Sequence, residues 1–103
     1  MNILQDEFLQ RLEEITELSK KVNKNDTEKI LTMIRSHAFE ISDLYHRNEN
    51  HYSVETADLI VLCFELLLIG KKDIDDVFSR CLPRFDKKLK RLLDDDTKSK
   101  AVQ

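Results

Sequence analysis

The residues that tight turns and irregular loops require are scarce in this sequence. Its 103 residues include one glycine, one proline and no tryptophan. Hairpin turns depend on glycine and proline at special backbone angles, so a fold built from many short strands is excluded. What remains is 36% charged and 41% hydrophobic, in a length that suits a single domain. This composition predicts an all-α protein.

The chain also lacks an excess of charge, a leader and a membrane span. The net charge is −3 with both signs interspersed, which argues against nucleic acid or an anionic membrane as a partner. The opening MNILQDEF has no basic and apolar leader pattern, and the apolar run Leu59–Ile69 is too short for a bilayer and contains Glu65. Cys63 and Cys81 form no CxxC motif, so we expect two buried, reduced thiols in a cytoplasmic protein.

The most apolar stretch of the sequence is Val54–Gly70, VETADLIVLCFELLLIG. A helix that is apolar on nearly every side belongs in the middle of a bundle. Glu55 and Asp58 are three residues apart, so their carboxylates project from one face near the start of this helix. Burying carboxylates without a partner is costly, and metal binding would supply one.

Apolar residues at spacings of three and four predict the other helices. The stripe that begins Phe78, Leu82, Phe85 keeps its register across Pro83, which predicts a kink or a brief break rather than a new element. The apolar period stops after Leu92, so we expect a single domain over 1–93 and a disordered tail over 94–103. The helices are expected over 3–22, 26–46, 54–70 and 73–92.

Four residues are candidate helix boundaries. Asn25 and Ser53 are expected to cap the second and third helices, and Asp73 the fourth. Gly70, the only glycine, is expected at the C′ position that ends the third helix.

A short polar connection over 47–53 predicts that the second and third helices are antiparallel neighbours. His37 then falls on the inward face of the second helix. Glu40 and Asp43, also three apart, lie on a flank of that face. We therefore expect this carboxylate pair to face Glu55 and Asp58.

At this point the chain resembles the all-α nucleotide pyrophosphohydrolases, which include the MazG proteins, the dimeric dUTPases and phosphoribosyl-ATP pyrophosphatase. The resemblance covers residues 26–92 and is carried by Glu55-Thr56-Ala57-Asp58 followed by LIVLCFELLLIG, with KDIDDVF at 72–78. It implies a four-helix MazG-like bundle that dimerises through helix faces. In the family's E-E-x-x-E motif only the last glutamate is matched, by Glu40, because Ser36 and His37 replace the first two. An intact Glu13-Glu14-x-x-Glu17 in the first helix is an alternative location for that motif.

The resemblance implies hydrolysis of a nucleoside triphosphate to the monophosphate and pyrophosphate, with Mg²⁺, or alternatively Mn²⁺, as cofactor. The resemblance implies Glu40, Glu55 and Asp58 as metal ligands, and the facing pair predicted from helical spacing adds Asp43, which has no strict family counterpart. The candidate catalytic residues are Glu40, Glu55 and His37, the last as a replacement for a glutamate of the family motif. Arg80 and Arg84, on a basic face of the fourth helix, are candidate contacts for the substrate phosphates. The long apolar faces exceed what one short bundle can bury, so we also expect a homodimer or a higher homo-oligomer.

Other interpretations of the same residues remain open. His37 is a core histidine, a replacement ligand or base, or a mark of lost catalysis. The acids are metal ligands or surface charges paired with cations such as Arg47, and the basic face contacts phosphate or solvent. The alternative function is a catalytically inactive MazG-like module for protein interaction or nucleotide sensing.

Overall fold

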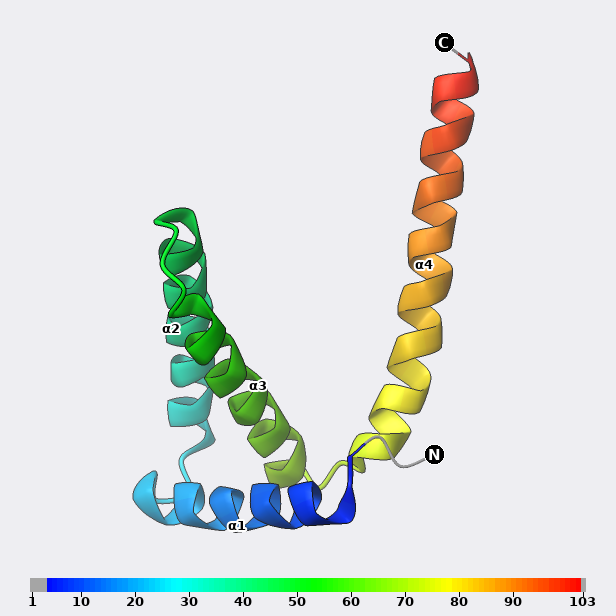
Figure 1. The fold of residues 1–103 in the computed structure, drawn as a ribbon. Helices are drawn as coiled ribbons and strands as arrows, with labels where there is room; N and C mark the ends of the chain where they lie inside the picture. The colour runs from blue at the N-terminus through cyan, green and yellow to red at the C-terminus, as the bar shows by residue number, and fades with distance from the viewer. Residues whose placement is uncertain (1–3, 103) are drawn as a thin grey trace.

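The computed structural model describes residues 4–102, and the side chains of residues 4–97. Within this range the chain forms helices and no strand, which confirms the all-α prediction. The helices are α1 (Asp6–Val22), α2 (Thr27–His46), α3 (Tyr52–Ile69) and α4 (Ile74–Val102). Figure 1 shows α2 and α3 as an antiparallel pair, α1 crossing beneath them, and α4 leading away.

The third helix is the centre of the arrangement. Among the described residues, α3 packs against α1, α2 and α4, and these three do not pack against one another. Tyr45 and Tyr52 meet edge to face across the α2–α3 turn, with ring centroids 5.3 Å apart. The prediction of an antiparallel α2–α3 hairpin is therefore confirmed (Figure 1).

The core of a single chain is small. Its buried apolar side chains are Leu12, Ile30, Leu62 and Ile74. The third helix lies in the middle of the arrangement, as its apolar sequence predicts, but one chain does not cover all of it, because Val54 and Ile60 are about half exposed. The apolar stripe predicted for α1 also reaches the core mainly through Leu12. Its other members are 43–77% exposed: Phe8, Ile15, Leu18 and Val22.

The caps differ from the sequence prediction at two helices. Asp26, and not Asn25, caps α2, because its carboxylate accepts a hydrogen bond of 3.1 Å from the backbone N–H of Glu28. Asn25 instead takes the left-handed conformation (φ 60°) in the turn before it. The third helix begins at Tyr52, so Ser53 lies inside it and does not cap it.

The ends of the α3–α4 connection agree better with expectation. Asp73 accepts a hydrogen bond of 3.1 Å from the N–H of Asp76 at the start of α4, as predicted. Gly70 follows the last residue of α3, but its φ is −76°. Lys71 takes the left-handed conformation (φ 58°) that was expected of the glycine.

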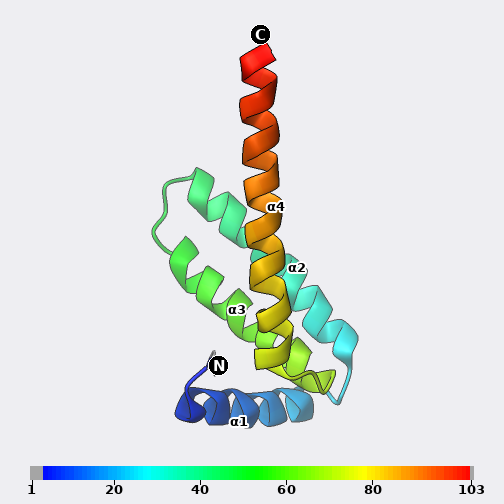
Figure 2. The same cartoon turned by 90° about the vertical axis from the view of Figure 1, so that its right-hand side faces the viewer.

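The fourth helix is longer than predicted. It continues through Pro83 as one element and extends to Val102, past the end predicted at residue 92. No glycine or proline follows Pro83 to stop the helix, and Thr97 donates a hydrogen bond of 3.0 Å to the carbonyl of Leu93. Figures 1 and 2 show that most of α4 projects beyond the other helices, so one chain does not form a closed bundle.

Two smaller expectations concern the thiols and the membrane. Cys63 is exposed and Cys81 partly exposed, so the prediction of two buried thiols is wrong, although both are free of disulfides. Both thiols lie within apolar periodic patterns, and one chain leaves these positions open. Within residues 4–102, no helix combines the length and hydropathy that a membrane crossing requires.

Candidate metal centre

His37, Glu55 and Asp58 converge between α2 and α3. The Nε2 atom of His37 lies 3.4 Å from Oε2 of Glu55 and 4.0 Å from Oδ2 of Asp58. One potential ligand atom from each residue lies within 4.8 Å of the others, so a single cation could contact all three. The His37 and Glu55 side chains are only 24% and 16% exposed, whereas Asp58 is more than half exposed. The cluster is therefore walled on the protein side and open on the other.

The hydrogen bond on the far side of the His37 ring determines what its Nε2 can do. Nδ1 lies 2.9 Å from the carbonyl oxygen of Met33 in the preceding turn of α2. A carbonyl only accepts, so Nδ1 carries a proton and the neutral ring has its lone pair on Nε2. The lone pair on Nε2 faces the carboxylates of Glu55 and Asp58. These negative and electron-rich groups lie so close together that a positive charge between them is required to stabilise them. Either a second ring proton or a metal ion supplies it, and a backbone carbonyl on the other ring nitrogen is common for metal-binding histidines.

His51 is a contributor that sequence reasoning missed. Its Nε2 lies 3.4 Å from Oε1 of Glu55, the oxygen that does not face His37. Glu55 is thus flanked by an imidazole on each side. The sequence signal was the spacing of four residues between His51 and Glu55, which places both on one side of the first turn of α3.

The predicted ligands on α2 do not join this group. Asp43 is paired with Arg47, whose Nε and Nη2 donate to Oδ2 at 3.1 and 2.8 Å, which is the surface-pair alternative considered above. Glu40 is exposed and is not part of the three-residue cluster. The residue of α2 that meets Glu55 and Asp58 is therefore His37, rather than the carboxylate pair expected to face them.

Arg80 and Arg84 lie far from the cluster within one chain. Both are exposed on α4, which packs only against α3, and Arg80 pairs with Asp76 at 3.3 Å. Figure 1 shows that α4 begins beside the C-terminal end of α3, whereas Glu55 lies in the first turn of α3 at the other end. A single chain does not bring these cations to the candidate metal centre.

The alternative acidic motif in α1 behaves as surface charge. Glu13, Glu14 and Glu17 are all exposed, and Glu17 pairs with Lys20 at 3.1 Å within the same helix. In the described residues α1 does not pack against α2. Within one chain, these glutamates therefore do not reach the cluster of His37, Glu55 and Asp58.

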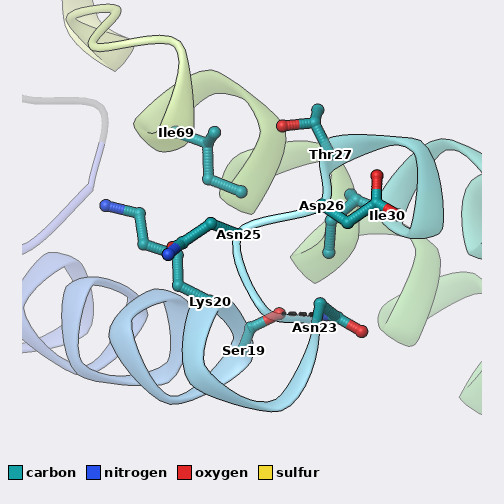
Figure 3. A pocket seen from close by; sticks show the side chains of 8 residues that line it. All are labelled: Ser19, Lys20, Asn23, Asn25, Asp26, Thr27, Ile30 and Ile69. Carbon is teal, nitrogen blue, oxygen red and sulfur yellow. Dashed lines mark hydrogen bonds between the residues drawn. The ribbon is translucent and has the colours of Figure 1, made fainter.

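The surface hollows elsewhere on the chain are lined by residues outside the cluster of His37, Glu55 and Asp58. Figure 3 shows one beneath the α1–α2 turn, where Asn23 donates a hydrogen bond of 3.1 Å to Ser19 and where Ile30 and Ile69 form the apolar wall. Its volume of about 70 Å³ is room for a few waters, well below what a nucleotide needs.

One carboxyl is buried away from the cluster. Glu65 of α3 is 4% exposed and lies at the contact with α1, where it pairs with Ser19. Burial raises the pKa of Glu65 above its ordinary value of 4.5, and a hydrogen bond with Ser19 opposes that rise. Glu65 is therefore part of the packing between α1 and α3. It has no partner in common with His37 or Asp58.

Comparison with protein-family models, with curated proteins and with solved structures finds no significant match.

Proposed function

We propose that this chain is a metal-dependent nucleoside triphosphate pyrophosphohydrolase whose ion is held by His37, Glu55 and Asp58. The observation that carries the proposal is the convergence of three ligand atoms within 4.8 Å, one of them the lone-pair nitrogen of a histidine oriented by Met33. Two of the three, Glu55 and Asp58, belong to the E-x-x-D segment that resembles the all-α pyrophosphohydrolases.

The ligand set favours Mn²⁺ over Mg²⁺. Both ions accept carboxylate oxygens, but Mg²⁺ prefers an all-oxygen shell, whereas an imidazole suits Mn²⁺ and later metals better. Glu40 lies three residues after His37, so it shares a helix face with this ligand. Because its side chain is exposed, it can turn toward an ion at little cost and serve as a further ligand.

Glu55 has two tasks in this chemistry, as a ligand of the ion and as the acceptor of a proton. An ion held by the three residues would neutralise phosphate charge and polarise the phosphoryl oxygens. Glu55 orients a water and accepts its proton, while His51 holds the second oxygen of that carboxylate. The water oxygen bonds to the α-phosphorus, the bond to the α–β bridging oxygen breaks, and pyrophosphate leaves with the electron pair.

One chain leaves the cluster open on the side of Asp58 and offers it no nearby cation from α4. We therefore assign the activity to a homodimer, in which a second chain adds the missing walls. Arg80 and Arg84 are the cations that such a partner would offer to the phosphates.

The test is release of pyrophosphate from a panel of NTPs and dNTPs, with Mn²⁺ and then with Mg²⁺. Asp58→Asn removes one ligand charge and should lower turnover by on the order of 100-fold or more. Asp43→Asn is the matched control, because Asp43 is an exposed acid already paired with Arg47, and its turnover should stay within about twofold of the unchanged protein.

A second candidate is the inactive interaction or nucleotide-sensing module. It is favoured by one feature, since a proton on Nε2 of His37 would satisfy Glu55 and Asp58 without any metal. A folded protein that binds nucleotide but releases no pyrophosphate with either ion would establish this alternative and refute the enzyme.

A further inference from the structure

The fourth helix makes its contacts at one end only. Within the described residues α4 packs against α3 alone, and the ring centroids of Phe64 and Phe78 lie 6.0 Å apart at that contact. Figures 1 and 2 agree that the helix then leads away from the rest of the chain. Most helical stability in proteins comes from tertiary packing of an apolar face, and nothing in one chain supplies it for most of this helix of 29 residues.

The unsupported part of α4 carries a continuous apolar stripe. Its members are spaced by three and four residues and are 53–68% exposed: Leu82, Phe85, Leu89, Leu92 and Leu93. The stripe begins one turn after Phe78, so it continues the surface that Phe78 presents to α3. Charged residues occupy the rest of the helix, with ion pairs at Arg80–Asp76 and Lys90–Asp86.

A matching surface runs along α3 from the same contact. Ile60 lies one turn before Phe64 on the same helix face and is half exposed, and the neighbouring Cys63 is exposed as well. Two apolar stripes therefore diverge from the Phe64–Phe78 contact, one along each helix. Each of them is uncovered in a single chain.

The exposed area indicates how large the missing partner is. The chain exposes 8420 Å², whereas a folded monomer of 12.2 kDa exposes about 6,000 Å², so the excess is about 2,400 Å². The radius of gyration of 17.8 Å likewise exceeds the value of about 13 Å for a compact chain of this length. A stable dimer needs about 800 Å² from each partner, and obligate dimers use more, so the excess is of the size that a protein interface covers.

We infer that the α4 stripe, together with the Ile60 surface of α3, is the interface with a second copy of this chain. A two-fold dimer uses the same patch on both copies, so one contact covers both stripes of each chain at once. The inference names the interface of the homodimer proposed above, but its test requires neither metal nor nucleotide.

The test is the mass of the purified full chain by light scattering coupled to gel filtration. We expect twice the 12.2 kDa of one chain. The double variant Phe85→Glu/Leu89→Glu places two charges on the stripe and should reduce the mass to that of a monomer, with circular dichroism reporting whether α1–α3 stay helical. Both side chains are more than half exposed in one chain, so their loss removes little from its own core.

Lys87→Glu is the matched control. It changes the net charge by the same amount as the double variant but lies two residues from both positions, on the opposite side of α4. It should leave the dimer intact. If the double variant aggregates, Leu93→Glu, at the most exposed residue of the stripe, replaces it.

Three results would overturn the inference. The unchanged protein could be a monomer, the stripe variants could remain dimeric, or Lys87→Glu could dissociate the dimer as completely as they do. Because mass is measured without substrate, an inactive dimer would refute the proposed enzyme alone. An active monomer would refute the interface and the assignment of activity to a dimer, and would leave the metal centre of one chain in place.

Discussion

At the scale of single residues, the two ring nitrogens of His37 have different partners. One is bound to the Met33 carbonyl, and the other faces the carboxylates of Glu55 and Asp58. An imidazole ligand lowers the relative affinity for Mg²⁺, and a carboxylate in its place would raise it.

His37→Glu should therefore shift the preference for Mn²⁺ over Mg²⁺ toward Mg²⁺, by on the order of tenfold. The measurement is displacement of bound Mn²⁺ by added Mg²⁺. His46→Glu is the control, because His46 bonds to the Ser42 carbonyl and is not part of the cluster. An unchanged preference in His37→Glu would show that Nε2 does not contact the ion.

Glu65 offers a prediction about pH that is independent of the metal centre. Burial raises its pKa in the folded state, so the native protein binds more protons than the unfolded chain as the pH rises above 4.5. The contribution of Glu65 to stability must then fall as the pH rises through that interval.

Glu65→Gln keeps a hydrogen-bonding partner for Ser19 and removes the charge. Its melting temperature should exceed that of the unchanged protein at pH 7, and the difference should disappear as the pH falls to 4.5. Glu13→Gln, at an exposed position of the facing helix, should show no such trend. A lower melting temperature for Glu65→Gln at pH 7 would contradict the account.

The sequence was sufficient to single out Glu55, Asp58 and the inward position of His37, because each follows from helical spacing. It was not sufficient to decide which α2 side chain meets α3. That depends on how the two helices cross, and on Arg47, which holds Asp43 on the surface.

At the scale of helices, the best test is the start of α2. Asp26 accepts from the Glu28 N–H, so Asp26→Ala should lower the free energy of unfolding by about 1 kcal/mol. Ser53 bonds only to the exposed Asn50 carbonyl, so Ser53→Ala should cost clearly less. Urea denaturation measures both, and equal losses would show that Asp26 does not act as a cap.

Helix existence was predictable here, and helix ends were less so. The apolar periods locate all four helices, and the register across Pro83 predicts one continuing element. The ends depend on turn geometry that the residue types do not specify uniquely. Asn25 and Asp26 are both good capping residues, and only the left-handed backbone at Asn25 decides between them.

At the scale of the whole molecule, apolar faces were predictable but their partners were not. The exposed stripes of α1 and α4 carry the expected period, and one chain does not fold them into a closed bundle. The spacing of apolar residues predicts that a helix face is buried. It does not predict whether the same chain or another chain buries that face.

A dimer held by α4 makes stability depend on concentration. The unfolding midpoint should rise as the protein concentration increases, because mass action favours the folded dimer. Phe85→Glu/Leu89→Glu should remove most of this dependence. A midpoint that is constant across a hundredfold dilution of the unchanged protein would contradict a coupled dimer.

The most direct test of the central claim is a titration of the nucleotide-free protein with Mn²⁺, followed by the electron paramagnetic resonance signal of the free ion. The account predicts saturable binding by the unchanged protein and by Asp43→Asn, and a loss of affinity of on the order of 100-fold in Asp58→Asn. Absence of binding by the unchanged protein, or equal losses in the two variants, would show that His37, Glu55 and Asp58 do not form a metal site.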